Sequence, residues 1–312
     1  MNDKKFGCLM GGIVGDAFGS PYQFRQRYTY EITDDMEFCK IYEVPAGSFT
    51  DDSSMMLCLA QSLTDKNGFD PKDQMEKYGD WLEYGYMSSI DKAFDVGNTT
   101  ASSVGKYVTD RSRNNISDIE SYGLTDDRRC GNAGIMRLGP IPVFYSKYED
   151  AIKYARLSSA VTHAHEDCLD CASIMSHVVF KLLHGCGKHE ALDVSIFENS
   201  VSENVNRICK GEYKNYTRDQ IRTTGYVVDT LEAAMWALYV TNSYEEGMKL
   251  LARMGNDVDT VCCVFGQLAG AYYGTKGIPE RWIHALQKKS MVLGVINNFI
   301  NTNDAPLDTI II

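Results

Sequence analysis

The stretch Gly255-Asn256-Asp257-Val258-Asp259-Thr260 decides how the rest of this chain is interpreted. It places two carboxylates two residues apart in a turn that begins with glycine, and it leads directly into an apolar, helix-compatible segment. Carboxylate and hydroxyl oxygens are hard ligands of the kind that Mg²⁺ and Mn²⁺ prefer. The stretch therefore predicts an oxygen-rich metal loop at the start of a helix.

A second acidic loop lies far upstream, where Thr50-Asp51-Asp52 also opens an apolar segment. Clustered carboxylates repel one another, and their burial is costly unless cations compensate the charge. Either loop alone fits a simpler interpretation, in which its acids cap a helix or lie solvated in the first turn. The two together favour a pair of divalent cations, Mg²⁺ or Mn²⁺. The expected ligands are Thr50, Asp51, Asp52, Asp257, Asp259 and Thr260.

Length and composition exclude several classes of protein. The 312 residues, of which 44% are hydrophobic, are enough for a large core, and no linker divides them, so one domain over residues 1–312 is expected. A net charge of −11 without a run of basic residues argues against a nucleic-acid surface. The N-terminal segment has no signal peptide or membrane span, which predicts a cytoplasmic protein with reduced cysteines.

Helical periodicity dominates the chain, and only two short segments, 38–44 and 143–145, have β-like sequences. The glycine-rich segment 6–19 is expected to form a tightly packed buried helix, and the polar segment 22–45 a long loop that covers or shapes a site. The fold class predicted is all-α. Further helices are expected over residues 71–86, 191–208, 227–240, 244–254, 261–273, 279–286 and 290–299.

Two glycine–asparagine turns, Gly97-Asn98 and Gly131-Asn132, precede helix-compatible segments. Such turns expose backbone amides, so they are candidate phosphate or ribose contacts, although ordinary helix starts have the same sequence. The segment Thr162-His163-Ala164-His165, followed by Cys168 and Cys171, has a spacing similar to that of a zinc site. The two cysteines continue an apolar helical stripe, so buried thiols are expected there rather than structural zinc.

Five separated blocks occur in an order that resembles the ADP-ribosylglycohydrolase family, and the resemblance covers almost the whole chain. It implies a compact orthogonal multi-helix bundle with a binuclear Mg²⁺ or Mn²⁺ centre in a central cleft that accepts ADP-ribose. It also implies hydrolysis of an N- or O-glycosidic bond that releases ADP-ribose from a modified protein or an ADP-ribosyl small molecule. A monomer is expected. The blocks are Gly15-Asp16-Ala17-Phe18-Gly19 with Pro21-Tyr22-Gln23-Phe24, Thr50-Asp51-Asp52, Gly131-Asn132-Ala133-Gly134-Ile135-Met136-Arg137, Thr162-His163-Ala164-His165 and Asp257-Val258-Asp259-Thr260.

The resemblance also assigns roles to individual residues. The two acidic loops would hold the metals from opposite sides, and the substrate would contact Gly97, Asn98, Gly131, Asn132 and His163. The candidates for catalysis are Asp51, Asp52, Asp95 and Gln23.

The chain departs from the family pattern at Gln23, where the family commonly has a glutamate. Glutamine cannot act as a general base, so Asp95 is an alternative acid or base. Two other functions stay open at this point. One is a catalytically weakened protein that binds ADP-ribose as a sensor, sink or inhibitor, and the other is a metal-dependent phosphohydrolase.

Overall fold

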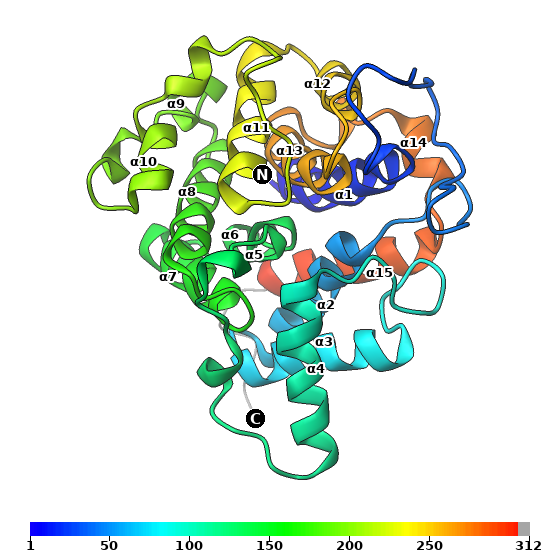
Figure 1. The fold of residues 1–312 in the computed structure, drawn as a ribbon, viewed down its shortest axis with the longest axis vertical. Coiled ribbons are helices and arrows are strands. Elements are labelled where there is room, and N and C mark those ends of the chain that lie inside the picture. Colours follow the sequence, from blue (N-terminus) through cyan, green and yellow to red (C-terminus); the bar gives the residue numbers. More distant parts are fainter. Residues whose placement is uncertain (305–312) are drawn as a thin grey trace.

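The computed structural model describes residues 1–304, and α-helices form almost all of its regular structure (Figure 1). The β-structure within these residues is limited to isolated bridges such as Cys39–Val44 and Gly131–Tyr226. The all-α prediction is therefore confirmed. The helices are α1 (Asn2–Gly19), α2 (Asp51–Lys66), α3 (Pro71–Tyr84), α4 (Asn98–Ser112), α5 (Ala133–Met136), α6 (Pro140–Phe144), α7 (Tyr148–Ala160), α8 (Glu166–Leu183), α9 (Lys188–Ala191), α10 (Glu203–Cys209), α11 (Val227–Val240), α12 (Tyr244–Ala252), α13 (Val258–Tyr273), α14 (Glu280–Ala285) and α15 (Lys289–Asp304).

Helices α1 and α13 form the centre of the packing, and they lie side by side in Figure 1 with α11, α12 and α14 around them. Glycines recur every fourth residue on the α1 face that meets α13. A Cβ added at Gly11 would lie 2.3 Å from the carbonyl oxygen of Gly266, and one added at Gly15 would lie 2.2 Å from that of Cys262. The two backbones are thus in direct contact, which only glycine permits.

This contact brings the two acidic loops together at the C-terminal end of α1. A Cβ at Gly19, the last residue of α1, would lie 2.6 Å from the Cα atom of Asp259 in the first turn of α13. One turn earlier, the carboxylate of Asp16 accepts the backbone amide of Thr50, the residue that caps α2. The helix predicted from the glycine-rich segment therefore holds both candidate metal loops.

Two sequence-based expectations are wrong. Residues 191–208 do not form one helix, because α9 ends at Ala191 and α10 begins only after Ser202. The Ser202 hydroxyl caps α10 by accepting a hydrogen bond from the amide of Val205. Residues 143–145 are not a strand, because Pro140 begins α6, and the fixed φ of proline suits the first turn of a helix.

The segment after the first 3₁₀ turn (Ser20–Tyr22) is a long irregular loop, as predicted. Side chains tie it to distant parts of the fold: Arg27 donates to the carbonyls of Ile221 and Met254, and Tyr30 donates to that of Ala252. Its residues Phe24 and Tyr42 line the cavity described below. None of the described helices is long and apolar enough to cross a membrane.

Candidate active site

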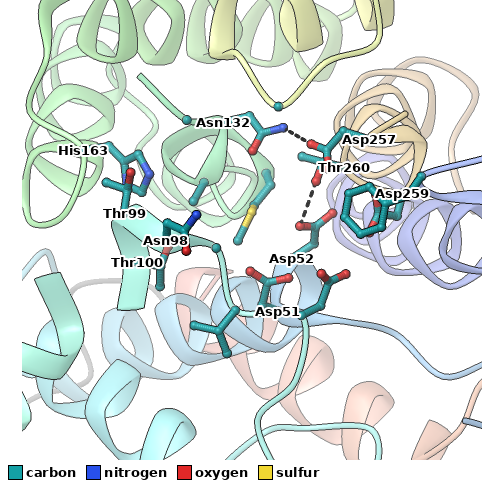
Figure 2. A pocket seen from close by; sticks show the side chains of 18 of the residues that line it. Asp51, Asp52, Asn98, Thr99, Thr100, Asn132, His163, Asp257, Asp259 and Thr260 are labelled. Carbon is teal, nitrogen blue, oxygen red and sulfur yellow. Dashed lines mark hydrogen bonds between the residues drawn. The ribbon is translucent and has the colours of Figure 1, made fainter. Parts of the chain in front are cut away.

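A cavity of about 630 Å³ opens where the N-termini of α2, α4 and α13 converge (Figure 2). Eleven of the site residues proposed from the sequence line it, whereas Gln23 and Thr50 lie behind its wall. Tyr42 and Gly225 also line it, and sequence analysis did not identify them. The eleven are Asp51, Asp52, Asp95, Gly97, Asn98, Gly131, Asn132, His163, Asp257, Asp259 and Thr260.

Four aspartates form an acidic cluster on one side of the cavity. Asp51 and Asp52 lie in the first turn of α2, Asp257 is the residue directly before α13, and Asp259 follows in the first turn of α13. The positive ends of the two helix dipoles favour carboxylates at these positions. Burial and then the repulsion of neighbouring carboxylates raise the pKa values of Asp51, Asp52 and Asp259 well above the ordinary aspartate range. Burial also raises the pKa of Asp257, to about 6.

Polar contacts connect the two acidic loops to each other and to the cavity wall. The hydroxyl of Thr260 donates to Oδ1 of Asp52 over 3.2 Å, across the gap between α13 and α2. On the opposite side, Nδ2 of Asn132 donates to Oδ2 of Asp257 over 2.6 Å (Figure 2). Asn132 thus positions an acidic side chain in addition to lining the cavity.

Asp16 supports the cluster from within α1, and the sequence analysis assigned it no role. Its carboxylate accepts four hydrogen bonds, from the backbone amides and hydroxyls of Thr50 and Ser53. Burial raises its pKa to about 7 although these hydrogen bonds act in the opposite direction. The hydroxyl of Thr50 therefore faces Asp16, and its predicted role as a metal ligand stays a prediction. The only sequence signal for Asp16 is a charged residue inside a small-residue helix.

The donor set fits divalent cations. Oδ2 of Asp52 and Oδ1 of Asp259 are buried without a hydrogen-bond partner, which is costly for carboxylate oxygens. The residues that line the cavity include no lysine or arginine to balance its five aspartates, the four of the cluster and Asp95. Oxygen-only ligands with excess negative charge are typical of Mg²⁺ or Mn²⁺ sites.

A tighter group of possible metal ligands lies behind the Gly131 wall. Among the described residues, Cys130, His165 and Asp167 are the group whose ligand atoms all lie within 4.8 Å of one another. Two of these residues already have partners: Nδ1 of His165 accepts a hydrogen bond from the amide of Asp167, and the Asp167 carboxylate accepts hydrogen bonds from the hydroxyls of Ser202 and Tyr226. The zinc-like spacing seen in the sequence does not form one cluster, since His163 lines the cavity while Cys168 and Cys171 are buried free thiols.

His163 presents a hydrogen-bond donor to the cavity. The Arg137 guanidinium donates to the Thr162 hydroxyl over 2.7 Å, and that hydroxyl lies 2.8 Å from Nδ1 of His163. Arginine can only donate, so the hydroxyl oxygen accepts from it, and we infer that the hydroxyl hydrogen points at Nδ1 and that the proton of the neutral ring is on Nε2. Burial and the Arg137 charge lower the pKa of His163 to about 3, so the ring is neutral at pH 7. Nε2 lies on the Gly131 side, facing the cavity.

The N-terminus of α4 forms the neighbouring part of the wall. Its cap residue, Gly97, has no side chain to bond the first-turn amides, and Asn98, Thr99 and Thr100 line the cavity. The first amides of a helix have no partner within it, and they favour anions. This end of the cavity therefore suits a phosphate group.

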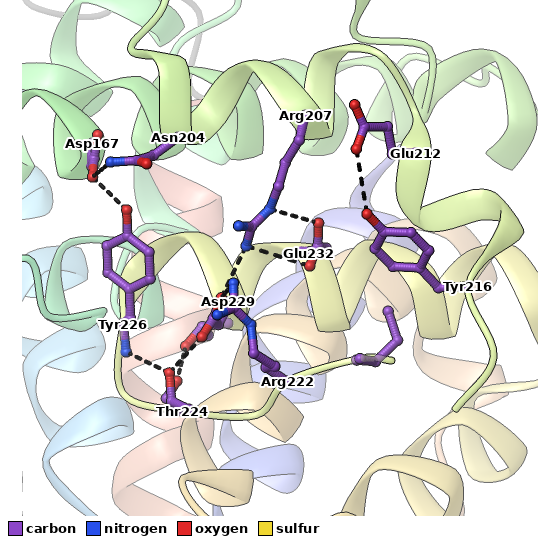
Figure 3. Close-up of polar contacts among 12 residues, drawn as sticks. Asp167, Asn204, Arg207, Glu212, Tyr216, Arg222, Thr224, Tyr226, Asp229 and Glu232 are labelled. Carbon is purple, nitrogen blue, oxygen red and sulfur yellow. Dashed lines mark hydrogen bonds and ion pairs between the residues drawn. The ribbon is translucent and has the colours of Figure 1, made fainter. Parts of the chain in front are cut away.

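Figure 3 shows how the wall that contains Gly225 is held. The Thr224 hydroxyl donates to Asp229, which also pairs with Arg207 and Arg222. On the other side of Gly225, the Tyr226 hydroxyl donates to Asp167 over 2.5 Å. These contacts fix the backbone of the wall.

Asp95 lies between two donors from the long loop. Nε2 of Gln23 donates to Oδ2 of Asp95 over 2.8 Å, and the Tyr42 hydroxyl donates to Oδ1. Asp95 has a φ of +57°, a left-handed conformation that non-glycine residues rarely adopt. Oε1 of Gln23 is buried without a partner.

Comparison with known proteins agrees with this fold. Residues 1–306 match the sequence profile of the ADP-ribosylglycohydrolase family. The chain is 34% identical over 282 residues to an ADP-ribosylarginine hydrolase, Tri1, of Pseudomonas putida, a match that covers 90% of this chain and 73% of that protein. It is 24% identical over 295 residues to the ADP-ribosyl-[dinitrogen reductase] glycohydrolase of Rhodospirillum rubrum, covering 93% of this chain and 92% of that protein.

A solved structure extends the similarity to three dimensions. A chain of an ADP-ribosylglycohydrolase-related protein complex superposes with a TM-score of 0.82 at 30% sequence identity, covering 97% of this chain and 98% of that one. The family match and the relatives named as hydrolases define the class of this protein as a hydrolase. The chain belongs to the ADP-ribosylglycohydrolase family.

Proposed function

We propose that this protein hydrolyses the N-glycosidic bond between ADP-ribose and an arginine side chain of a modified protein, and that it uses two Mg²⁺ or Mn²⁺ ions. One observation carries the proposal. A single cavity combines five aspartates, which no cationic side chain of its lining balances, with a wall of neutral donors suited to phosphate and ribose. Its volume of about 630 Å³ lies in the range of sites for small-molecule ligands and cofactors.

The arrangement of the cavity suggests how ADP-ribose binds. Figure 2 shows His163, Asn98 and Thr99 on one side and the acidic cluster on the other. The phosphates would accept from the first-turn amides of α4 and from Nε2 of His163. The ribose attached to the leaving group would then lie beside the aspartates. This orientation places the bond to be cleaved at the acidic end.

The metals would be held by Asp51, Asp52, Asp257 and Asp259, with Thr50 and Thr260 as further oxygen ligands. When bound, such ions fix ribose hydroxyls and make a water molecule more acidic. Asn132 and the Thr260 hydroxyl hold Asp257 and Asp52 in place for this role.

Asp95 is the carboxylate proposed to act on the reacting bond. Glycosidic cleavage develops positive charge at the anomeric carbon, which a nearby carboxylate stabilises, and the same group can accept a proton from the attacking water. Asp95 lines the cavity, whereas Gln23 only reaches it through Asp95.

The arginine linkage is chosen because the relative at 34% identity is named an ADP-ribosylarginine hydrolase. A second candidate function, ADP-ribose binding without turnover, is favoured by one observation, the glutamine at position 23. The absence of lysine and arginine from the cavity lining weighs against the phosphohydrolase alternative.

The test is incubation of the purified protein with arginine-linked and serine-linked ADP-ribosyl peptides, with Mg²⁺ or with EDTA, reading free ADP-ribose by mass spectrometry. We expect release from the arginine-linked peptide with Mg²⁺, no release with EDTA, and no release by Asp95→Asn. Release from the serine-linked peptide alone would contradict the arginine assignment. Tight binding of ADP-ribose with no release from either peptide would establish the binding function instead.

A further inference from the structure

We propose that Gln23 and Tyr42 are positioning residues that hold the Asp95 carboxylate from two sides, so that glutamine at position 23 serves Asp95 rather than replacing a lost base. The inference rests on the proposed function, in which Asp95 acts on the ADP-ribosyl bond. It explains why a glutamine can stand beside the cavity of a hydrolase.

The two contacts are complementary. A glutamine amide and a phenol each donate one hydrogen bond, and each reaches a different oxygen of Asp95. Burial and the neighbouring Asp95 charge raise the pKa of Tyr42, so the phenol keeps its proton and remains a donor. A carboxylate with a donor on each oxygen has a fixed orientation.

The backbone of Asp95 needs such support. A left-handed aspartate is strained, and this conformation persists only where surrounding contacts hold it. The Tyr42 ring also packs edge-on against Phe94, with ring centroids 5.4 Å apart. Tyr42 therefore holds the turn through its ring and Asp95 through its hydroxyl.

Gln23 also joins Asp95 to the second acidic loop. The amide of Phe24 donates to the carbonyl of Asn256 over 2.6 Å, and the amide of Asn256 donates back to the carbonyl of Arg25 over 3.1 Å. Asn256 directly precedes Asp257. The segment 23–25 thus spans from Asp95 to the Asp257 loop, and the side chain of Gln23 helps to set how far apart they are.

A glutamate at position 23 would undo this arrangement. The donor that now lies 2.8 Å from Asp95 would become a carboxylate oxygen, and two like charges at that distance repel. Gln23→Glu is therefore expected to lower activity, although it introduces the residue that family members commonly have there.

The experiment compares Gln23→Glu and Tyr42→Phe with two controls from the same loop. Gln26→Glu introduces the same charge at an exposed position, and Tyr28→Phe removes a hydroxyl that donates to Asp219 outside the cavity. With an arginine-linked ADP-ribosyl peptide and Mg²⁺, each test variant should lower kcat about tenfold to a hundredfold, the size expected when a reacting group is displaced. KM and the Kd for ADP-ribose should stay within about twofold, because the phosphate wall is untouched. The controls should match the parent.

A double variant separates positioning from simple stabilisation. Gln23→Glu with Asp95→Asn exchanges donor and acceptor across the same contact, so the thermal stability lost in Gln23→Glu should return while kcat does not. Additive effects of the two substitutions on stability would overturn the contact itself, and this readout does not depend on activity.

The kinetic outcomes decide the positioning role. An unchanged or higher kcat in Gln23→Glu, or recovery of kcat in the double variant, would overturn it. A parent protein that binds ADP-ribose but releases none from the peptide would instead refute the proposed function. Asp95 would then have no catalytic role, even if the stability measurements confirm its contact with Gln23.

Discussion

Gly15→Ala tests the claim that direct backbone contact between α1 and α13 builds the acidic site. The added Cβ would lie 2.2 Å from the carbonyl oxygen and 2.7 Å from the carbonyl carbon of Cys262, whereas ordinary van der Waals contact begins near 3.4 Å. Both partners are backbone atoms, so no side chain can rotate away. The two helices must separate by roughly 1 Å, and close-packed interiors resist such shifts.

The magnitude follows from two opposing effects. Overpacking a well-packed core costs about 1–3 kcal/mol, and a contact with backbone belongs at the upper end of that range. Alanine has a higher helix propensity than glycine, and this difference offsets about 0.5–1 kcal/mol of the overpacking cost. We expect a net loss of about 2 kcal/mol in the free energy of unfolding, or a fall in Tm of about 3 °C for a chain of this size.

The matched control is Gly294→Ala in α15, where the added Cβ would meet nothing within 4 Å. The same change of residue should stabilise the protein there by about 0.5–1 kcal/mol. Urea unfolding of both variants measures the difference, and calorimetry with Mn²⁺ should show weaker binding only in Gly15→Ala, because α13 carries Asp259 in its first turn. If Gly15→Ala is as stable as Gly294→Ala, the close backbone contact is wrong.

Three further outcomes are expected. Asp259→Asn should weaken Mn²⁺ binding at least tenfold by calorimetry, because it removes an oxygen charge from the cluster; parent-like affinity would exclude Asp259 as a ligand. The pKa of His163 is about 3 in the folded chain against an ordinary 6.5, so stability is lost as the pH falls from about 6.5 towards 3, at about 1.4 kcal/mol per pH unit. Urea unfolding at pH 5 and pH 7 should show a smaller loss in His163→Gln than in the parent, and an equal loss would contradict the buried neutral ring. Asn132→Leu should weaken both ADP-ribose and Mn²⁺ binding, because the leucine cannot donate to Asp257; a change in neither, by calorimetry, would count against that role.

The sequence predicted those parts of the site that depend on local chemistry. Asp257 and Asp259 stand at the start of a helix, so their spacing alone predicts that both carboxylates lie in one site, and both line the cavity. Asp16 and Tyr42 act through partners 34 and 53 residues away in the chain, a relation that no local pattern records. Their importance becomes visible only when α1 and the long loop are placed in space.

The limits of the helices also depend on how far local sequence chemistry decides the structure. The period over 227–240 coincides with α11 because that helix is buried along most of its length and apolar periodicity decides its limits. Residues 191–208 are much less apolar, and within them the Ser202 cap begins a new helix. Local capping chemistry therefore overrides the helical periodicity of this segment.

The contact between α1 and α13 also has a consequence for biosynthesis. The two helices lie at opposite ends of the described chain, Asn2–Gly19 and Val258–Tyr273. At a translation rate of about 5–20 residues per second, α13 leaves the ribosome roughly 10–50 s after α1. During that interval the glycine face of α1 has no partner, and the acidic loops cannot meet. The ability to bind metal should therefore arise late and all at once, when nearly the whole chain has been made, rather than growing as the nascent protein lengthens.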